Sequence, residues 1–212
     1  MGLYSKYVLP RLIHLACGSR PITRQRAKIV PRASGRVLEI GIGSGLNLPF
    51  YDPARVTEVL GLDPAPELTD RARRAAHGVP MNVEFVSASA EEIPLEAASF
   101  DTVVVTYTLC SIPDVSSALA EMRRVLRPGG SLLFCEHGRA PDASVERWQN
   151  RIDPLWKRLA GGCHLSRDIP ALLRASGFET VDLESTYIPG WRPASFNYWG
   201  AAGRDSSLHS AT

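Results

Sequence analysis

Cysteine is scarce and scattered in this chain of 212 residues. Its four cysteines are Cys17, Cys110, Cys135 and Cys163, and none belongs to a Cys-x-x-Cys pair. Structural zinc sites usually draw their ligands from such closely spaced pairs, so the spacing predicts no metal site. We expect four free thiols, as is usual for a protein of the reducing cytoplasm.

The chain also lacks long apolar runs and a strong net charge. No apolar run approaches the roughly 20 residues that a membrane-spanning helix needs. The formal net charge is only +2, which gives no basic stripe for nucleic acid. We see no signal peptide and no internal repeat, and we therefore expect a cytoplasmic protein without a nucleic-acid partner. Hydrophobic residues make up 44% of the chain, enough for the core of one domain.

An apolar run followed by three glycines stands near the start of this domain. Residues 37–40, Val-Leu-Glu-Ile, suit a buried parallel strand, and Gly41, Gly43 and Gly45 follow at alternate positions. Glycine allows a sharp turn and lets a ligand approach the backbone closely. A strand that opens into such a loop is typical of nucleotide-binding α/β sheets, which bind ligands at the carboxyl ends of their strands.

A second apolar run, residues 56–62, ends on Asp63. A carboxylate at the tip of this strand can accept two hydrogen bonds from a ribose diol. Redox dinucleotide folds share this acid, but their loop has the spacing Gly-x-Gly-x-x-Gly and faces a pyrophosphate. Here the spacing is Gly-x-Gly-x-Gly, which suits a ligand without phosphates.

Four motifs over residues 36–135 resemble those of the class I S-adenosylmethionine-dependent methyltransferases. They are the glycine loop, Asp63, the Phe100-Asp101 pair before an apolar strand, and the sequence Leu-Arg-Pro-Gly-Gly at residues 126–130. Further along, Glu136-His137-Gly138 and Gly162-Cys163-His164-Leu165 resemble the branch of alkyl-thiol S-methyltransferases, with ubiquinone/menaquinone C-methyltransferases and phospholipid N-methyltransferases as neighbours. The resemblance implies an α/β, Rossmann-like fold: a seven-stranded, mostly parallel sheet with helices on both faces and an antiparallel last strand.

We divide the chain into three parts. Residues 35–202 form the methyltransferase domain, residues 1–34 precede it as a helical lid or extension, and residues 203–212 are a polar tail. In the domain we expect a helix over 65–77, one that starts after Asp114, and a last helix over 167–176 that Ser166 caps. The fifth strand is expected over residues 131–135.

Residues 1–34 have three interpretations, which the sequence leaves open. They form a lid over the cofactor pocket, a basic amphipathic segment on a membrane surface, or helices packed at the domain edge. The second interpretation would make the protein peripheral to a membrane through weak contacts.

The resemblance implies that the cofactor is S-adenosylmethionine. Glu39 and the three glycines would hold its amino-acid end, Asp63 its ribose, and the segment from Ser89 to Glu91 its adenine. Ser89 stands where the family often has an aspartate. The full expected cofactor set is Glu39, Gly41, Gly43, Gly45, Asp63, Pro64, Ser89, Ala90, Glu91, Thr106 and Leu109.

The methyl acceptor is expected to be a small or lipid-like molecule with a thiol, an amine or an activated carbon. A thiol must lose its proton, and His137 or His164 is the candidate general base, with His137 preferred. A structural role for either histidine is the alternative. The expected substrate-side residues are Tyr7, Tyr107, Cys110, Trp148 and His164.

Other functions stay open at this point. A phospholipid N-methyltransferase at the membrane surface, a nicotinamide-dependent reductase and a protein that binds the cofactor without turnover are the alternatives. The sequence does not predict an oligomeric state.

Overall fold

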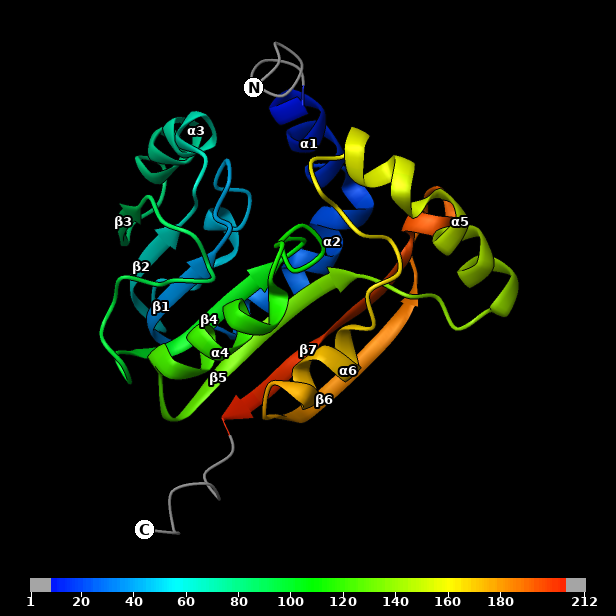
Figure 1. Ribbon diagram of the computed structural model, residues 1–212. Coiled ribbons are helices and arrows are strands. Elements are labelled where there is room, and N and C mark those ends of the chain that lie inside the picture. Colours follow the sequence, from blue (N-terminus) through cyan, green and yellow to red (C-terminus); the bar gives the residue numbers. More distant parts are fainter. Residues whose placement is uncertain (1–8, 205–212) are drawn as a thin grey trace, which may run out of the picture.

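Short apolar runs separated by glycine and proline turns form a seven-stranded sheet in the computed structural model, which describes residues 9–204 (Figure 1). The strands lie in the order β3-β2-β1-β4-β5-β7-β6. Only β7 is antiparallel to its neighbours, and it lies between β5 and β6. The predicted fold class is confirmed. The strands are β1 Gly35–Ile40, β2 Val56–Leu62, β3 Asn82–Val86, β4 Phe100–Thr106, β5 Leu126–His137, β6 Phe178–Tyr187 and β7 Phe196–Arg204.

Helices cover both faces of this sheet. On one face α4 and α6 pack over a core that includes Leu38, Phe134 and Leu119. On the other face, the core of Ile29, Val59 and other apolar residues joins α2 and α3 to the sheet. The central strands are buried on both faces, because a parallel sheet between two helix layers has no solvent side. The helices are α1 Leu9–Cys17, α2 Arg20–Ile29, α3 Pro66–Ala76, α4 Val115–Val125, α5 Ala143–Leu159 and α6 Ile169–Ala175, with short 3-10 turns at Val30–Arg32, Leu48–Phe50 and Arg192–Ala194.

Several element boundaries differ from the sequence expectation. The strand β7 runs to Arg204, so the first two residues of the expected polar tail 203–212 belong to the sheet. The last helix begins at Ile169 and is capped by Asp168, whose carboxylate accepts from the amide of Ala171 at 3.0 Å. Ser166 is therefore not its cap. The fifth strand begins at Leu126, directly after α4, rather than at Ser131, because Leu126 already pairs with Phe100. The intervening Arg-Pro-Gly-Gly residues form a bulge in this strand.

The expected N-cap of α4 is present, since the carboxylate of Asp114 accepts from the amide of Ser117 at 3.1 Å.

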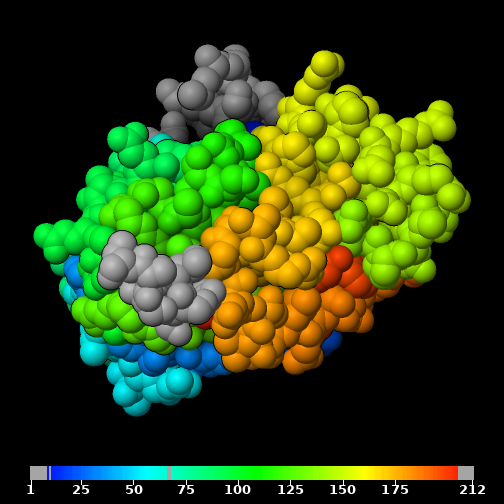
Figure 2. Space-filling view, turned by 60° about the horizontal axis from the view of Figure 1, so that its bottom comes forward, coloured from blue at the N-terminus to red at the C-terminus, as the bar shows by residue number. Residues whose placement is uncertain are grey.

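The helix α5 follows β5 and lies beyond the ends of β6 and β7, where it forms one end of the molecular surface (Figure 2). Within residues 9–204, no helix has both the length and the apolar character to cross a membrane. The sequence had given no bounds for α5.

Candidate active site

A cavity of about 360 Å³ opens where the carboxyl ends of β1, β2 and β4 meet the N-terminal helices. Its wall includes the glycine loop after β1 and Asp63 after β2. Thr106 at the end of β4 and Cys17 of α1 also line it. The strand tips of an open α/β sheet are where such folds bind ligands, so this cavity is the candidate active site.

The glycine loop has the backbone conformation that its sequence predicts. Gly41, Gly43 and Gly45 have φ angles of +67°, +54° and +78°, values that are unfavourable for residues with a Cβ atom. A Cβ atom on Gly41 would lie 2.4 Å from the Thr108 side chain, so only glycine lets the loop pass there. The amide of Gly43 donates to Asp63 Oδ2 at 2.9 Å and links the tips of β1 and β2.

Asp63 lies on the cavity wall with both carboxylate oxygens engaged by backbone amides. Its Oδ1 accepts from Ala65 at 2.8 Å, and its Oδ2 accepts from Gly43. Burial raises the pKa of this carboxyl group, and the two amide hydrogen bonds partly offset the rise. Each oxygen keeps a further lone pair, so the carboxylate is fixed in place and still able to accept from a ribose diol.

Eight of the eleven expected cofactor residues line the cavity, and three do not. Those on the wall are Gly41, Gly43, Asp63, Pro64, Ser89, Ala90, Glu91 and Thr106. The hydroxyl of Ser89 donates to the carboxylate of Glu91, so these two side chains are hydrogen-bonded to each other at the expected adenine position. Gly45 packs against Leu48 and Ala72 behind the loop, and Leu109 is fully buried in the core beside α4.

Glu39 is the third expected residue that does not reach the cavity. Its buried carboxylate accepts from Asn47 Nδ2 at 3.0 Å and from the Tyr51 hydroxyl at 2.8 Å. Burial raises the pKa of Glu39 to about 7. Glu39 therefore supports the glycine loop from behind and does not line the cavity, and its contact with the amino-acid end of the cofactor stays a prediction.

Arg26 of α2 is a site residue that the sequence analysis missed. It is only 5% exposed, yet its guanidinium lines the cavity. Nη1 donates to Asn47 Oδ1 at 2.8 Å and to the Thr106 hydroxyl, and the group lies 5.2 Å from the ring centre of Tyr107. Its Nε has no hydrogen-bond partner among the described residues. A buried cation favours an anionic partner, so Arg26 suits the carboxylate of an amino-acid ligand.

The helix α1 contributes one side of the cavity through Ile13, His14 and Cys17. His14 Nδ1 and Ser44 Oγ share a hydrogen bond of 2.7 Å, which ties α1 to the glycine loop. This position is compatible with the lid interpretation, which stays a prediction. The expected substrate residue Tyr7 lies outside the described residues.

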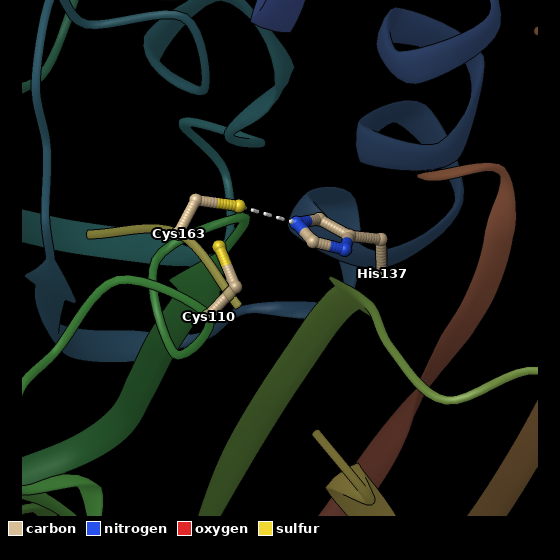
Figure 3. Close-up of side chains that lie close together, drawn as sticks. All are labelled: Cys110, His137 and Cys163. Atoms are coloured by element: carbon tan, nitrogen blue, oxygen red, sulfur yellow. Dashed lines mark hydrogen bonds between the residues drawn. The ribbon is translucent and has the colours of Figure 1, made fainter. Parts of the chain in front are cut away.

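Next to the cavity, three side chains from distant parts of the sequence converge (Figure 3). Cys110 follows β4, His137 ends β5, and Cys163 follows α5. His137 Nε2 lies 3.2 Å from Cys163 Sγ, and the nitrogen and both sulfur atoms lie within 4.8 Å of one another. We call these three residues the Cys-His-Cys cluster. The hydrogen bond from Cys110, together with that from His137, lowers the pKa of Cys163 below its usual value.

Buried hydrogen bonds hold the loop that carries Cys110. The fully buried Glu136 accepts from the amides of Thr108 at 2.7 Å and Leu109 at 3.1 Å. On the other side of the loop, the guanidinium of Arg167 donates to the carbonyls of Leu109 and Ile112. The loop after β4 is therefore fixed from two sides before any ligand arrives.

The remaining residues expected on the substrate side lie in different places in the structure. Tyr107 lines the cavity, whereas Cys110 adjoins it through its neighbour Ser111. His164 does not line the cavity, and its Nδ1 lies 3.4 Å from Asp153. Trp148 is 60% exposed on α5 and also lies outside the cavity.

The observed cavity fits S-adenosylmethionine on its own geometry. Asp63 at the tip of β2 can accept from the ribose diol, and the buried Arg26 beside Thr106 suits the carboxylate of the amino-acid part. The glycine loop lets the ligand approach the backbone closely. When bound, this cofactor supplies an electrophilic methyl group on a sulfonium.

Comparisons with known proteins agree with this reading. A methyltransferase-domain family profile matches residues 38–134. The thiol S-methyltransferase TMT1B of Homo sapiens is 37% identical over 177 residues, which cover 80% of this chain and 72% of that protein. The phosphatidylethanolamine N-methyltransferase of Cereibacter sphaeroides is 34% identical over 135 residues, 61% of this chain and 66% of that protein. The match covers 65% to 72% of the length of four thiol S-methyltransferases.

Solved structures share the fold. A methyltransferase from Thermotoga maritima superposes with a TM-score of 0.67 at 20% identity, covering 95% of this chain and 98% of that one. The protein is thus an enzyme that uses S-adenosylmethionine to methylate a small acceptor. It belongs to the class I S-adenosylmethionine-dependent methyltransferase family.

Proposed function

We propose that the acceptor is a thiol carried by a small, largely apolar molecule. The observation that carries this proposal is the Cys-His-Cys cluster, which lies directly beside the cofactor cavity. The similarity to thiol S-methyltransferases supports it. Apolar side chains on the cavity wall, among them Ile13, Leu46 and Ile112, favour an apolar acceptor.

Methyl transfer to a thiol requires two contributions from this protein. It must align the acceptor with the sulfonium methyl group, because the transfer is an in-line displacement. It must also remove the proton of the thiol, since the thiolate is the nucleophile. Glu136 and Arg167 fix the loop after β4 for the first task, and we assign the second to the cluster that contains His137.

Three acceptors with one alkyl chain test the proposal. A thiol, an alcohol and a primary amine of equal chain length are offered with S-adenosylmethionine, and the methylated products are measured by mass spectrometry. We expect turnover of the thiol and at least 100-fold lower kcat/KM for the other two. A thiolate is a strong nucleophile, whereas the alcohol hardly ionises and the amine is almost fully protonated at neutral pH. Preferential methylation of the amine, or of phosphatidylethanolamine in vesicles, would contradict the proposal.

A histidine pair tests the role of the cluster within this function. His137→Ala should lower kcat at least 10-fold while leaving the affinity for S-adenosylhomocysteine unchanged, because His137 does not line the cofactor cavity. His77→Ala, on the surface after α3, is the matched control and should behave as the wild type. Wild-type kcat in the His137 variant would remove the cluster from the reaction.

A membrane surface is a second element of this proposal, supported by exposed apolar residues at one end of the molecule. Leu12 and Leu15 of α1 are 50% and 70% exposed, and Leu155 of α5 is 61% exposed. Basic residues accompany them, including Arg11 and Arg158. We propose that this surface rests weakly on anionic lipid, where apolar thiols concentrate.

Vesicle flotation tests the contact. The double variant Leu12→Ser/Leu15→Ser should float less with anionic vesicles than the wild type, because it removes apolar area from the contact. Val181→Ser on β6, which is 71% exposed away from α1, is the control and should float normally. Equal flotation of all three proteins, or none, would contradict the proposal.

A further inference from the structure

The three side chains of the Cys-His-Cys cluster are also metal-ligating groups. Its atoms face one another: the two sulfurs and His137 Nε2 point into a common space (Figure 3). Among the described residues it is the one group of three metal-ligating side chains whose donor atoms lie this close together. The sequence spacing had predicted no metal site, because Cys110, His137 and Cys163 lie far apart in the sequence.

We propose that Cys110, His137 and Cys163 bind a zinc ion whose fourth position is open to the acceptor thiol. The inference rests on the proposed thiol acceptor and names how that thiol is held. Two sulfurs and one imidazole nitrogen are a donor set that zinc prefers, and three protein ligands with one open position are typical of catalytic zinc.

The distances between the donors fit such an ion. Zinc bonds of about 2.3 Å to sulfur and 2.0 Å to nitrogen put tetrahedral donors roughly 3.5 Å apart. His137 Nε2 and Cys163 Sγ are 3.2 Å apart, and no pair in the cluster exceeds 4.8 Å. Side-chain movements on the order of 1 Å therefore suffice, and the backbone can stay in place.

The backbone under the three ligands is already held. The amide of His164 donates to the carbonyl of Cys110 at 2.8 Å and joins the two cysteine loops. The amide of Cys163 donates to Ala160 at 3.3 Å. His137 pairs with Asn197 in the sheet. A preformed frame of this kind lowers the entropy that metal binding must overcome.

The Cys-His-Cys cluster adjoins the cofactor cavity. Ser111, next to Cys110, and Gly161, two residues before Cys163, both lie on the cavity wall. Cys17 also lies on that wall and interacts electrostatically with Cys163, but its sulfur is not part of the cluster. The site therefore has three ligands from the chain, and an acceptor in the cavity can supply the fourth.

Zinc keeps the same charge and oxidation state throughout the methyl transfer, and the atoms and electrons balance. The acceptor R–SH loses its proton to solvent as its sulfur binds zinc. The bound thiolate sulfur then donates an electron pair to the methyl carbon, and the bond from that carbon to the sulfonium sulfur breaks with its pair remaining on sulfur. The products are the thioether R–S–CH₃, S-adenosylhomocysteine and one proton. The neutral thioether is a weak ligand and leaves the metal.

Metal content tests the first half of the inference. The protein is purified with a phosphine reductant, loaded with zinc or cobalt(II), dialysed and assayed for metal by mass spectrometry. We expect one zinc per chain in the wild type and at least 10-fold weaker binding in Cys110→Ser and Cys163→Ser. Cys17→Ser is the matched control and should keep its zinc. Binding of S-adenosylhomocysteine by each variant shows that it is folded.

A wild type that retains no zinc against a mild chelator would overturn the inference. Equal zinc content in the wild type and both cluster variants would overturn it as well. Loss of zinc in Cys17→Ser would contradict the claim that the fourth coordination position is open, because Cys17 would then be the fourth ligand.

The cobalt form tests the second half through its spectrum. Adding the alkyl thiol should change the sulfur-to-cobalt charge-transfer bands, and the matched alcohol should not, because only the thiolate enters the open position. An unchanged spectrum with saturating thiol would overturn the acceptor site. Undiminished thiol methylation by metal-free protein would overturn the inference and leave the proposed function intact. Zinc binding together with methylation of the amine alone would instead overturn the proposed function.

Discussion

Asp63 serves the glycine loop and the ligand with the same carboxylate. Its oxygens accept from the amides of Gly43 and Ala65, which fixes both the loop and the side chain. Burial raises its pKa, so the anion is stabilised mainly by those two amides. A ribose diol would add two further donors to a group that already has its final position.

The first prediction at the residue scale concerns this carboxylate. Asp63→Ala should weaken binding of S-adenosylhomocysteine by about 1–3 kcal/mol, the loss expected for hydrogen bonds to a charged group. This is about 5- to 150-fold in Kd, measured by calorimetry. Asp70→Ala on the exposed side of α3 is the control. Equal affinity in the wild type and the Asp63 variant would refute the ribose assignment.

The second prediction concerns the pH dependence of stability. Glu39 has an ordinary pKa of 4.5, and burial raises it to about 7 in the folded protein. Between these values the folded state holds a proton that the unfolded state has lost, so stability falls as pH rises across this range. The wild type should lose about 3 kcal/mol between pH 5 and pH 8 in urea unfolding, relative to Glu39→Gln. Parallel pH profiles for the two proteins would show that Glu39 is not the cause.

At the scale of elements, the glycine loop carries a third prediction. Gly41→Ala should lower both stability and cofactor affinity, because its Cβ would come 2.4 Å from Thr108 and its φ is +67°. Gly129→Ala is the matched control: φ is +77° there, and nothing lies within 4 Å of the added Cβ. The control should lose only the backbone cost of about 1–2 kcal/mol and bind the cofactor normally. Identical unfolding midpoints for the two variants would contradict the close approach.

The helix α1 carries a fourth prediction. His14→Ala removes the bond to Ser44 that ties this helix to the glycine loop. Dissociation of S-adenosylhomocysteine, followed by stopped flow, should become about fivefold faster, as expected for one hydrogen bond of about 1 kcal/mol. Thr23→Ala, whose bond to Gly18 is exposed, is the control. An unchanged dissociation rate would argue against α1 as a lid.

Strands with short apolar runs beside recognisable motifs could be predicted, whereas the helix α5 could not. The strand β1 holds Val37, Leu38 and Ile40 before the glycine loop, and β4 holds three consecutive valines after Phe100-Asp101, so their places followed from the sequence. The 17-residue α5 has apolar residues at helical spacing, but Trp148, Leu155 and Leu159 are exposed. The helix buries only Val145, Gln149 and Asp153, so its apolar residues did not indicate where it lies on the domain. The cap of α6 was misplaced because Ser166 and Asp168 are both good caps two residues apart.

At the scale of the whole molecule, the sheet order decides what the site contains. The order β1-β4-β5 brings the ends of β4 and β5 side by side, so Cys110 and His137 meet although 27 residues separate them. Cys163 joins them through α5, whose position no motif had given. Arg26 was missed for a similar reason: within α2 nothing distinguishes it from Arg24 until the helix is placed on the sheet.

The cofactor cavity at the strand tips is the claim on which the thiol acceptor and the zinc site both depend. Calorimetric titration of the full chain with S-adenosylhomocysteine tests it most directly. We predict one site per chain, with a Kd on the order of micromolar, a usual range for enzyme ligands. A titration without binding heat at several temperatures, and without any rise in the unfolding temperature at saturating ligand, would contradict the account.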